Sequence, residues 1–203
     1  MFKFLAVFIS LASPLLAKFE NGDLIFTKTK GRQAIAVEAA TKSAWTHTAV
    51  IFLQNDTPMV LEAVQPVQII SLASYLKRGG PEAKHSFKRM KNPELLSPDL
   101  LVNAANWIRP HIGRDYDGRF QWSDQALYCS ELVWKIYKHG SNIELCAIKK
   151  VKDYNLIHPK VKRLIIERFG SISRLNLEEK IVAPSDLYQS ELLVEFHPLK
   201  VKQ

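Results

Sequence analysis

The stretch that decides the fold is Tyr128-Cys129-Ser130-Glu131-Leu132-Val133-Trp134-Lys135-Ile136-Tyr137. Its apolar residues recur at helical spacing, so it predicts a helix with an apolar face formed by Leu132, Val133, Ile136 and Tyr137. Gly140 is the predicted stop of this helix, after basic residues in the last turn. Cys129 therefore falls in the first turn.

A thiol in the first turn of a helix lies at the positive end of the helix dipole. Free backbone N–H groups at that end and the dipole both favour the thiolate, which is the form a cysteine nucleophile needs. The alternative is that Cys129 is a small buried hydrophobic residue, as most free cysteines are. This stretch alone favours the alternative, so the nucleophile hypothesis depends on partners elsewhere in the chain.

Residues 1–17 differ from the rest and predict a secretory signal peptide. Lys3 gives a short positive start, residues 4–16 are largely apolar, and Ala17 is the small residue before the expected cleavage point. The apolar run is short for a membrane span, so an uncleaved anchor is the less favoured alternative. We therefore expect an exported protein, periplasmic or extracellular, with no stable membrane span in the mature chain.

Composition and charge indicate a single globular domain and limit the kinds of partner expected. The chain has 203 residues, of which 47% are hydrophobic, which suits one domain with a sizeable core. Loss of residues 1–17 removes one lysine and no acid, which changes the formal net charge from +8 to +7. A basic exported protein suits an acidic surface such as cell wall or anionic lipid, although the charge can also serve solubility alone. The basic residues are scattered, so no nucleic-acid partner is expected.

The two cysteines, Cys129 and Cys146, allow a disulfide in an oxidising compartment. A helix running from Cys129 to His139 would span about 15 Å. The short segment after Gly140 would then have to return to the helix start, because a disulfide needs Cα atoms within about 7 Å. We expect two free thiols.

The remaining chain predicts an α+β fold with helices packed on a mostly antiparallel sheet. Strands are expected at residues 24–26, 46–53, 59–64, 85–90 and 192–196. Helices are expected at residues 31–41, from Ser71 to before Gly79, from Ser97-Pro98-Asp99 to Ile108, and at residues 159–169.

A cysteine hydrolase needs a base near the sulfur atom, and the chain has six histidines. His47 is the favoured base because a strand is a rigid support, and His111 is the main rival. His47 could also be an ordinary hydrogen-bonded core histidine. His139 and His158 lie at predicted helix ends, His85 in a connection, and His197 in the C-terminal tail.

A predicted hairpin gives His47 a partner. If Gln54 lies opposite Thr57, the loop has an even number of residues, and His47 and Glu62 point to the same face as diagonal neighbours. Glu62 stands on an otherwise apolar strand, where a carboxylate needs a partner. An odd loop would place the two side chains on opposite faces.

Several segments together resemble the YiiX/YebB-like family of permuted papain-fold amidases, relatives of the NlpC-type cell-wall peptidases. The matching segments follow the order of that family and cover most of the chain after residue 17: residues 22–26, 43–52, 61–67, Tyr116-Asp117, residues 122–124 and residues 128–134. The resemblance implies a circularly permuted papain-like fold, in one domain over residues 18–203.

The resemblance also implies roles for individual residues. Cys129 would be the nucleophile, His47 the base and Glu62 the residue that orients the base. Tyr116 matches a tyrosine near the nucleophile and would bind substrate or support the oxyanion. A packed aromatic ring with an exposed hydroxyl is the alternative for Tyr116.

These observations predict an exported cysteine hydrolase that cleaves an amide bond through a thioester. A cell-wall peptide is the expected substrate, from the resemblance and from export. The first alternative is a lipid-directed acyl hydrolase or acyltransferase with the same triad, and the second is a wall-binding module with a degenerate site. No cluster has metal-ligand spacing, so neither a metal nor a cofactor is expected.

Overall fold

The computed structural model describes residues 16–80 and 82–199. Within them, seven strands form a mostly antiparallel sheet in the order β1-β9-β6-β2-β3-β4-β5. A second, two-stranded sheet pairs β7 with β8. The strands are β1 (Leu16–Ala17), β2 (Asp23–Lys28), β3 (His47–Gln54), β4 (Thr57–Glu62), β5 (Gln68–Ser71), β6 (Lys84–Met90), β7 (Lys149–Lys150), β8 (Lys180–Ile181) and β9 (Leu193–Pro198).

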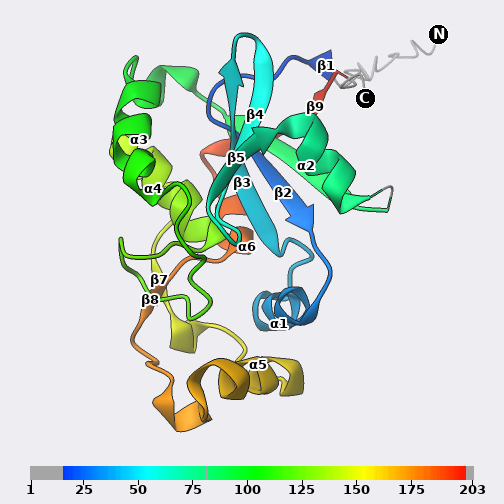
Figure 1. Ribbon diagram of the computed structural model, residues 1–203, viewed down its shortest axis with the longest axis vertical. Coiled ribbons are helices and arrows are strands. Elements are labelled where there is room, and N and C mark those ends of the chain that lie inside the picture. Colours follow the sequence, from blue (N-terminus) through cyan, green and yellow to red (C-terminus); the bar gives the residue numbers. More distant parts are fainter. Residues whose placement is uncertain (1–15, 81, 200–203) are drawn as a thin grey trace, which may run out of the picture.

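Helices cover both faces of the large sheet, which confirms the α+β prediction (Figure 1). Helix α4 (Cys129–Ser141) packs on one face, with α3 (Leu100–Ile108) against it, and α2 (Leu72–Gly79) packs on the other. Helices α1 (Arg32–Thr41) and α5 (Pro159–Phe169) lie together beyond one end of the sheet. The short helix α6 (Pro184–Tyr188) contacts α4.

Helix α4 is the central helix of the fold. It begins at Cys129 as predicted, and residues 129–137 are buried on all sides rather than along one face. The predicted stop at Gly140 is wrong, because Gly140 lies inside the helix and Asn142 is the left-handed C-cap. A Cβ atom at Gly140 would stand 2.5 Å from Leu100 Cδ1, so this glycine permits the close approach of α3.

The hairpin of β3 and β4 has the even loop on which the pairing of His47 and Glu62 depends. Gln54 lies opposite Thr57 and Leu53 opposite Pro58. Asn55 and Asp56 form the turn, with φ angles of 49° and 60°. Positive φ at both central residues is typical of the type I′ turn, whose twist matches that of the strands. The register therefore places the two side chains on the same face.

The other predicted elements differ from the structure mainly at their ends. Helix α5 has the predicted bounds and ends at Gly170, where φ is 80°. Helix α3 begins at Leu100, two residues after the predicted first position, because Pro98 and Asp99 form a turn before it. Both cysteines are free thiols, as expected.

Most of the predicted signal peptide, residues 1–15, lies outside the described residues. Leu16 and Ala17 form β1, which pairs in parallel with the end of β9. In residues 16–80 and 82–199, no helix is long and apolar enough to cross a membrane.

Candidate active site

His47 and Glu62 meet on the face of the sheet that α2 covers. His47 is the first residue of β3 and Glu62 the last of β4, and Nε2 of His47 lies 2.9 Å from Oε2 of Glu62. Tyr75 of α2 stacks on the imidazole, with ring centroids 6.3 Å apart. The ring is thus fixed by a carboxylate at one nitrogen and by an aromatic side chain on one face.

Three groups hold the buried Glu62 carboxylate. Besides His47, Gln68 Nε2 donates to Oε1 at 2.9 Å, and Arg78 Nη2 donates to Oε2 at 2.8 Å. Burial alone would raise the pKa of Glu62, but the bonds from His47 and Arg78 outweigh it and lower the pKa to about 2. Glu62 is therefore a carboxylate at neutral pH.

Cys129 lies at the start of α4, where the backbone N–H groups of Ser130 and Thr48 bond to its sulfur atom. The residue is buried, with 4% of its surface exposed, and burial raises the pKa of a thiol. The hydrogen bond and charge of His47, with the two backbone N–H groups, reverse this effect and lower the pKa of Cys129. These partners make the thiolate more accessible than it is in an ordinary buried cysteine.

The imidazole of His47 joins the other two groups. Its Nε2 faces Glu62, which leaves Nδ1 for the hydrogen bond to Cys129. Burial disfavours the charged ring, yet the bonds to Cys129 and Glu62 raise the pKa of His47 to about 9. These pKa values make His47 an imidazolium and Glu62 a carboxylate at neutral pH, and the charge of His47 favours a thiolate at Cys129.

Tyr116 stands near Cys129, on the segment that leads into α4. The Cys129 charge contributes to raising the Tyr116 pKa, although burial contributes more. Gln33 Nε2 of α1 donates to the Tyr116 hydroxyl at 2.9 Å. The hydroxyl is therefore held by a protein partner, and its own proton is left for another acceptor.

His111 is buried away from these groups. Its two ring nitrogens each lie 3.0 Å from a backbone carbonyl oxygen, those of Trp107 and Asp124. Neither nitrogen is directed at Cys129. The structure brings His47, and not its rival, to the thiol.

The sequence did not indicate three residues that support this site. Gln68 lies opposite Glu62 in the β4–β5 pair, so extending the strand pairing past the turn at Pro66 would have found it. Arg78 and Tyr75 come from α2. The spacing of residues in the sequence does not indicate that this helix packs on the face that carries His47 and Glu62.

A cysteine at the start of a central helix, opposite a histidine on the neighbouring sheet, is the arrangement of papain-like cysteine hydrolases. Here the histidine and the acid precede the cysteine along the chain. The model of the family described as "Permuted papain-like amidase enzyme, YaeF/YiiX, C92 family" matches residues 18–195. The chain belongs to this family, and it is a cysteine hydrolase of the amidase and peptidase type with a permuted papain-like fold.

Two relatives extend this assignment. The uncharacterized protein YiiX of Escherichia coli (strain K12) is 31% identical over 174 residues, which cover 86% of this chain and 84% of that protein. A crystal structure described as that of metalloprotein yiiX from Escherichia coli O157:H7 superimposes with a TM-score of 0.78 at 30% identity, covering 89% of this chain and 97% of the other. In residues 16–80 and 82–199 of the present chain, no three histidine, cysteine or acidic side chains lie together as a metal site requires.

Proposed function

We propose that this protein hydrolyses an amide bond through a covalent thioester on Cys129. The observation that carries the proposal is the bonded sequence of Cys129, His47 and Glu62. The Cys129 thiolate attacks the carbonyl carbon, and the imidazolium of His47 gives its proton to the departing amine. Water then attacks the thioester while His47 takes a proton from it, and collapse of the tetrahedral intermediate releases the acid and restores the Cys129 thiolate and the His47 imidazolium.

The tetrahedral intermediates of both steps carry a negative oxygen. The Cys129 N–H group lies in the first turn of α4, where no intrahelical acceptor is available to it. The Tyr116 hydroxyl, whose oxygen already accepts from Gln33, has its proton to donate. We assign these two donors to the oxyanion, a role for which one well-placed donor is worth about 100- to 1,000-fold in kcat.

Glu62 is a positioning residue in this scheme. It holds Nε2 of His47, so that Nδ1 faces the sulfur atom, and it stabilises the imidazolium. Arg78 and Gln68 hold Glu62 in turn.

The test of the proposal is amide cleavage by the purified protein, followed by mass spectrometry. We expect products that require Cys129, and a thioester adduct on Cys129 in samples quenched early. An intact substrate pool, with no adduct on Cys129, would overturn the proposed reaction.

Two finer parts of the proposal come from the sequence. The first is a cell-wall peptide as substrate, with an acidic surface as partner, and mass spectrometry of muropeptides incubated with the protein tests it. The second is export with cleavage near Ala17. Intact-mass analysis of the exported protein should show a chain that begins close to Lys18, whereas a chain beginning at Met1 would contradict export by this route.

A further inference from the structure

Two buried charged side chains of α4, Glu131 and Lys135, take no part in the proposed reaction. Glu131 is fully buried and Lys135 is 6% exposed, and Oε1 of the first lies 2.8 Å from Nζ of the second. Burial raises the pKa of Glu131 to about 8, against the opposing effect of Lys135. Removal of either side chain would leave a charge buried without its partner, so the two act as one unit.

This pair holds the loop of residues 116–128, which leads into α4. Glu131 accepts from the backbone N–H group of Ser123 at 3.1 Å and, more weakly, from that of Tyr128 at 3.5 Å. Lys135 donates to the Ser123 carbonyl at 2.9 Å and to the Asp124 carboxylate at 2.7 Å. The pair therefore satisfies both backbone groups of Ser123 and the N–H group of the residue that caps the helix.

The loop connects the two donors assigned to the oxyanion. Tyr116 stands at its start, and Cys129 follows its last residue. A β-bridge between Tyr116 and Leu127 joins the two ends of the loop, and the Asp117 N–H group donates to the Leu127 carbonyl at 3.1 Å. A shift of the loop would therefore move the Tyr116 hydroxyl relative to the Cys129 N–H group.

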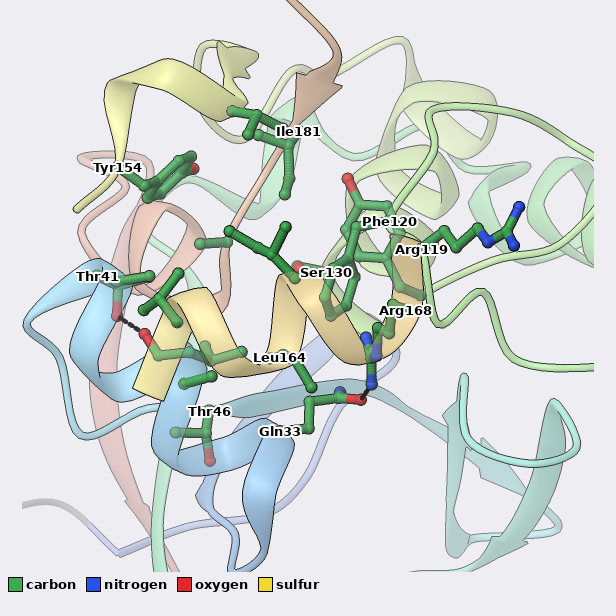
Figure 2. Close-up of a pocket in the computed structure, with 18 of the residues that line it drawn as sticks. Gln33, Thr41, Thr46, Arg119, Phe120, Ser130, Tyr154, Leu164, Arg168 and Ile181 are labelled. Carbon is green, nitrogen blue, oxygen red and sulfur yellow. Dashed lines mark hydrogen bonds between the residues drawn. The ribbon is translucent and has the colours of Figure 1, made fainter. Parts of the chain in front are cut away.

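The conformation of this loop requires anchors. Phe120 has a φ angle of 56°, a left-handed conformation that is strained for a bulky residue. Such strain persists only where surrounding contacts hold it. The Phe120 ring packs edge-on against Tyr128, with centroids 5.4 Å apart, and the Arg168 guanidinium lies 5.0 Å from its centroid. Phe120 and Arg168 also line the cavity beside Cys129 (Figure 2).

Arg168 of α5 anchors the loop on the side opposite to the buried pair. Its guanidinium donates to the Gly118 carbonyl and, at 2.6 Å, to Oε1 of Gln33 (Figure 2). Gln33 is the side chain whose Nε2 holds the Tyr116 hydroxyl. The loop is thus fixed from two sides, by Arg168 near its start and by the buried pair of α4 near its end.

We propose that Glu131 and Lys135 are positioning residues for the oxyanion site. The pair holds the loop against the start of α4, so that the Tyr116 hydroxyl and the Cys129 N–H group stay directed at one oxygen atom. This role rests on the proposed thioester chemistry, in which that oxygen carries the developing charge. Misplacement of a reacting group by about 1 Å can cost about 100-fold in rate, so a loosened loop should slow turnover. The thiolate should persist, because its partners on β3 are unchanged.

The experiment replaces both members of the pair, because a single change would leave one buried charge unpaired. Glu131→Gln combined with Lys135→Met removes both charges and nearly preserves the side-chain lengths. We expect kcat for amide cleavage to fall about 10- to 100-fold, with KM within about twofold of the native value. Alkylation of Cys129 by iodoacetamide needs the thiolate but forms no oxyanion, so its rate should stay within about twofold.

Lys138 and Glu144 provide the matched control. They form an exposed ion pair at the other end of α4, with Nζ and Oε1 2.8 Å apart. Lys138→Met combined with Glu144→Gln makes the same chemical change and should preserve both kcat and the alkylation rate. Thermal unfolding of the two double variants sets an assay temperature at which both are folded.

Equal losses of kcat and of alkylation rate in the Glu131 and Lys135 double variant would show a general disturbance of Cys129 and overturn the inference. An unchanged kcat would also overturn it. In a Tyr116→Phe background, removal of the pair should cost less than in the native protein, because one donor is already absent. A loss as large as the native one would place the pair outside the oxyanion site.

Acylation of Cys129 by 4-nitrophenyl acetate, read as adduct mass, separates this inference from the proposed function, because attack on an ester also forms an oxyanion. Acylation without any amide cleavage by the native protein would remove the amidase proposal, and slower acylation in the double variant would keep the positioning role. Amide cleavage and acylation at native rates in the double variant would keep the amidase and remove the positioning role.

Discussion

The two cysteines lie in different electrostatic environments, Cys129 buried and Cys146 half-buried. Cys129 is at the start of α4, and Cys146 is in the segment that follows the helix, where its carbonyl oxygen accepts from Trp134 Nε1 at 2.9 Å. The pKa of Cys146 is raised to about 12, chiefly by burial and further by the charge of Asp186. The pKa of Cys129 is lowered.

The difference shows that burial does not decide the state of a thiol. Burial acts on both side chains in the same direction, and His47 and two backbone N–H groups reverse it at Cys129 only. The interactions that stabilise the Cys129 thiolate therefore come from β3 and from the start of α4. Removing those partners one at a time should make Cys129 resemble Cys146.

The largest effect is expected from replacing each thiol in turn. Cys129→Ser should abolish amide hydrolysis, because a serine hydroxyl beside His47 does not ionise as the thiol does. Cys146→Ser should keep most of the activity. Steady-state rates, with circular dichroism as a control for folding, check this pair, and the opposite pattern would show that the nucleophile is misassigned.

Replacement of the base should have the next largest effect. His47→Ala should lower kcat by about 100- to 10,000-fold, the range of general acid–base catalysis. It should also slow alkylation of Cys129 by iodoacetamide at neutral pH, because the thiol loses the charge that lowers its pKa. His111→Ala is the control, and a loss as deep as that of His47→Ala would reopen the choice of base.

Glu62→Gln should have a smaller effect, because Cys129 and His47 remain. The variant removes the charge that helps to raise the pKa of His47, so that pKa should fall below about 9. In the native protein the imidazolium is lost as pH rises through about 9, so kcat/KM should decline there, and in Glu62→Gln the decline should begin at lower pH. Added to His47→Ala, the change should cost little more, whereas fully multiplicative losses would mean that Glu62 acts elsewhere.

The smallest effect is expected at Tyr116, because the Cys129 N–H group remains as the second donor to the oxyanion. Tyr116→Phe keeps the ring and removes the proton assigned to the oxyanion, so kcat should fall while KM changes little. Gln33→Leu, which leaves the hydroxyl in place but removes its donor, serves as the comparison and should lower kcat less. A change confined to KM in Tyr116→Phe would assign the hydroxyl to substrate binding instead.

The predictable parts of the molecule depended on local signals. The hairpin register followed from residues 54–57, and the bounds of α5 from Pro159 and Gly170. The role of Gly140 could not be deduced, because the residue that requires it, Leu100, lies forty positions earlier. The cavity that Cys129 lines could not be predicted for the same reason. Its walls include α1 and α5, which are more than a hundred residues apart in sequence and have no shared periodicity.

The predicted cleavage after Ala17 would remove strand β1 and change the edge of the sheet at β9. Leu16 and Ala17 pair with His197 and Pro198, so removal of residues 1–17 would open the last two positions of β9 to other chains. An open strand edge is a template for pairing with a second molecule. Pro198 has no N–H group to offer such a partner, and the preceding His197 is exposed and polar. The two positions that the predicted cleavage would uncover are therefore a poor template for strand addition.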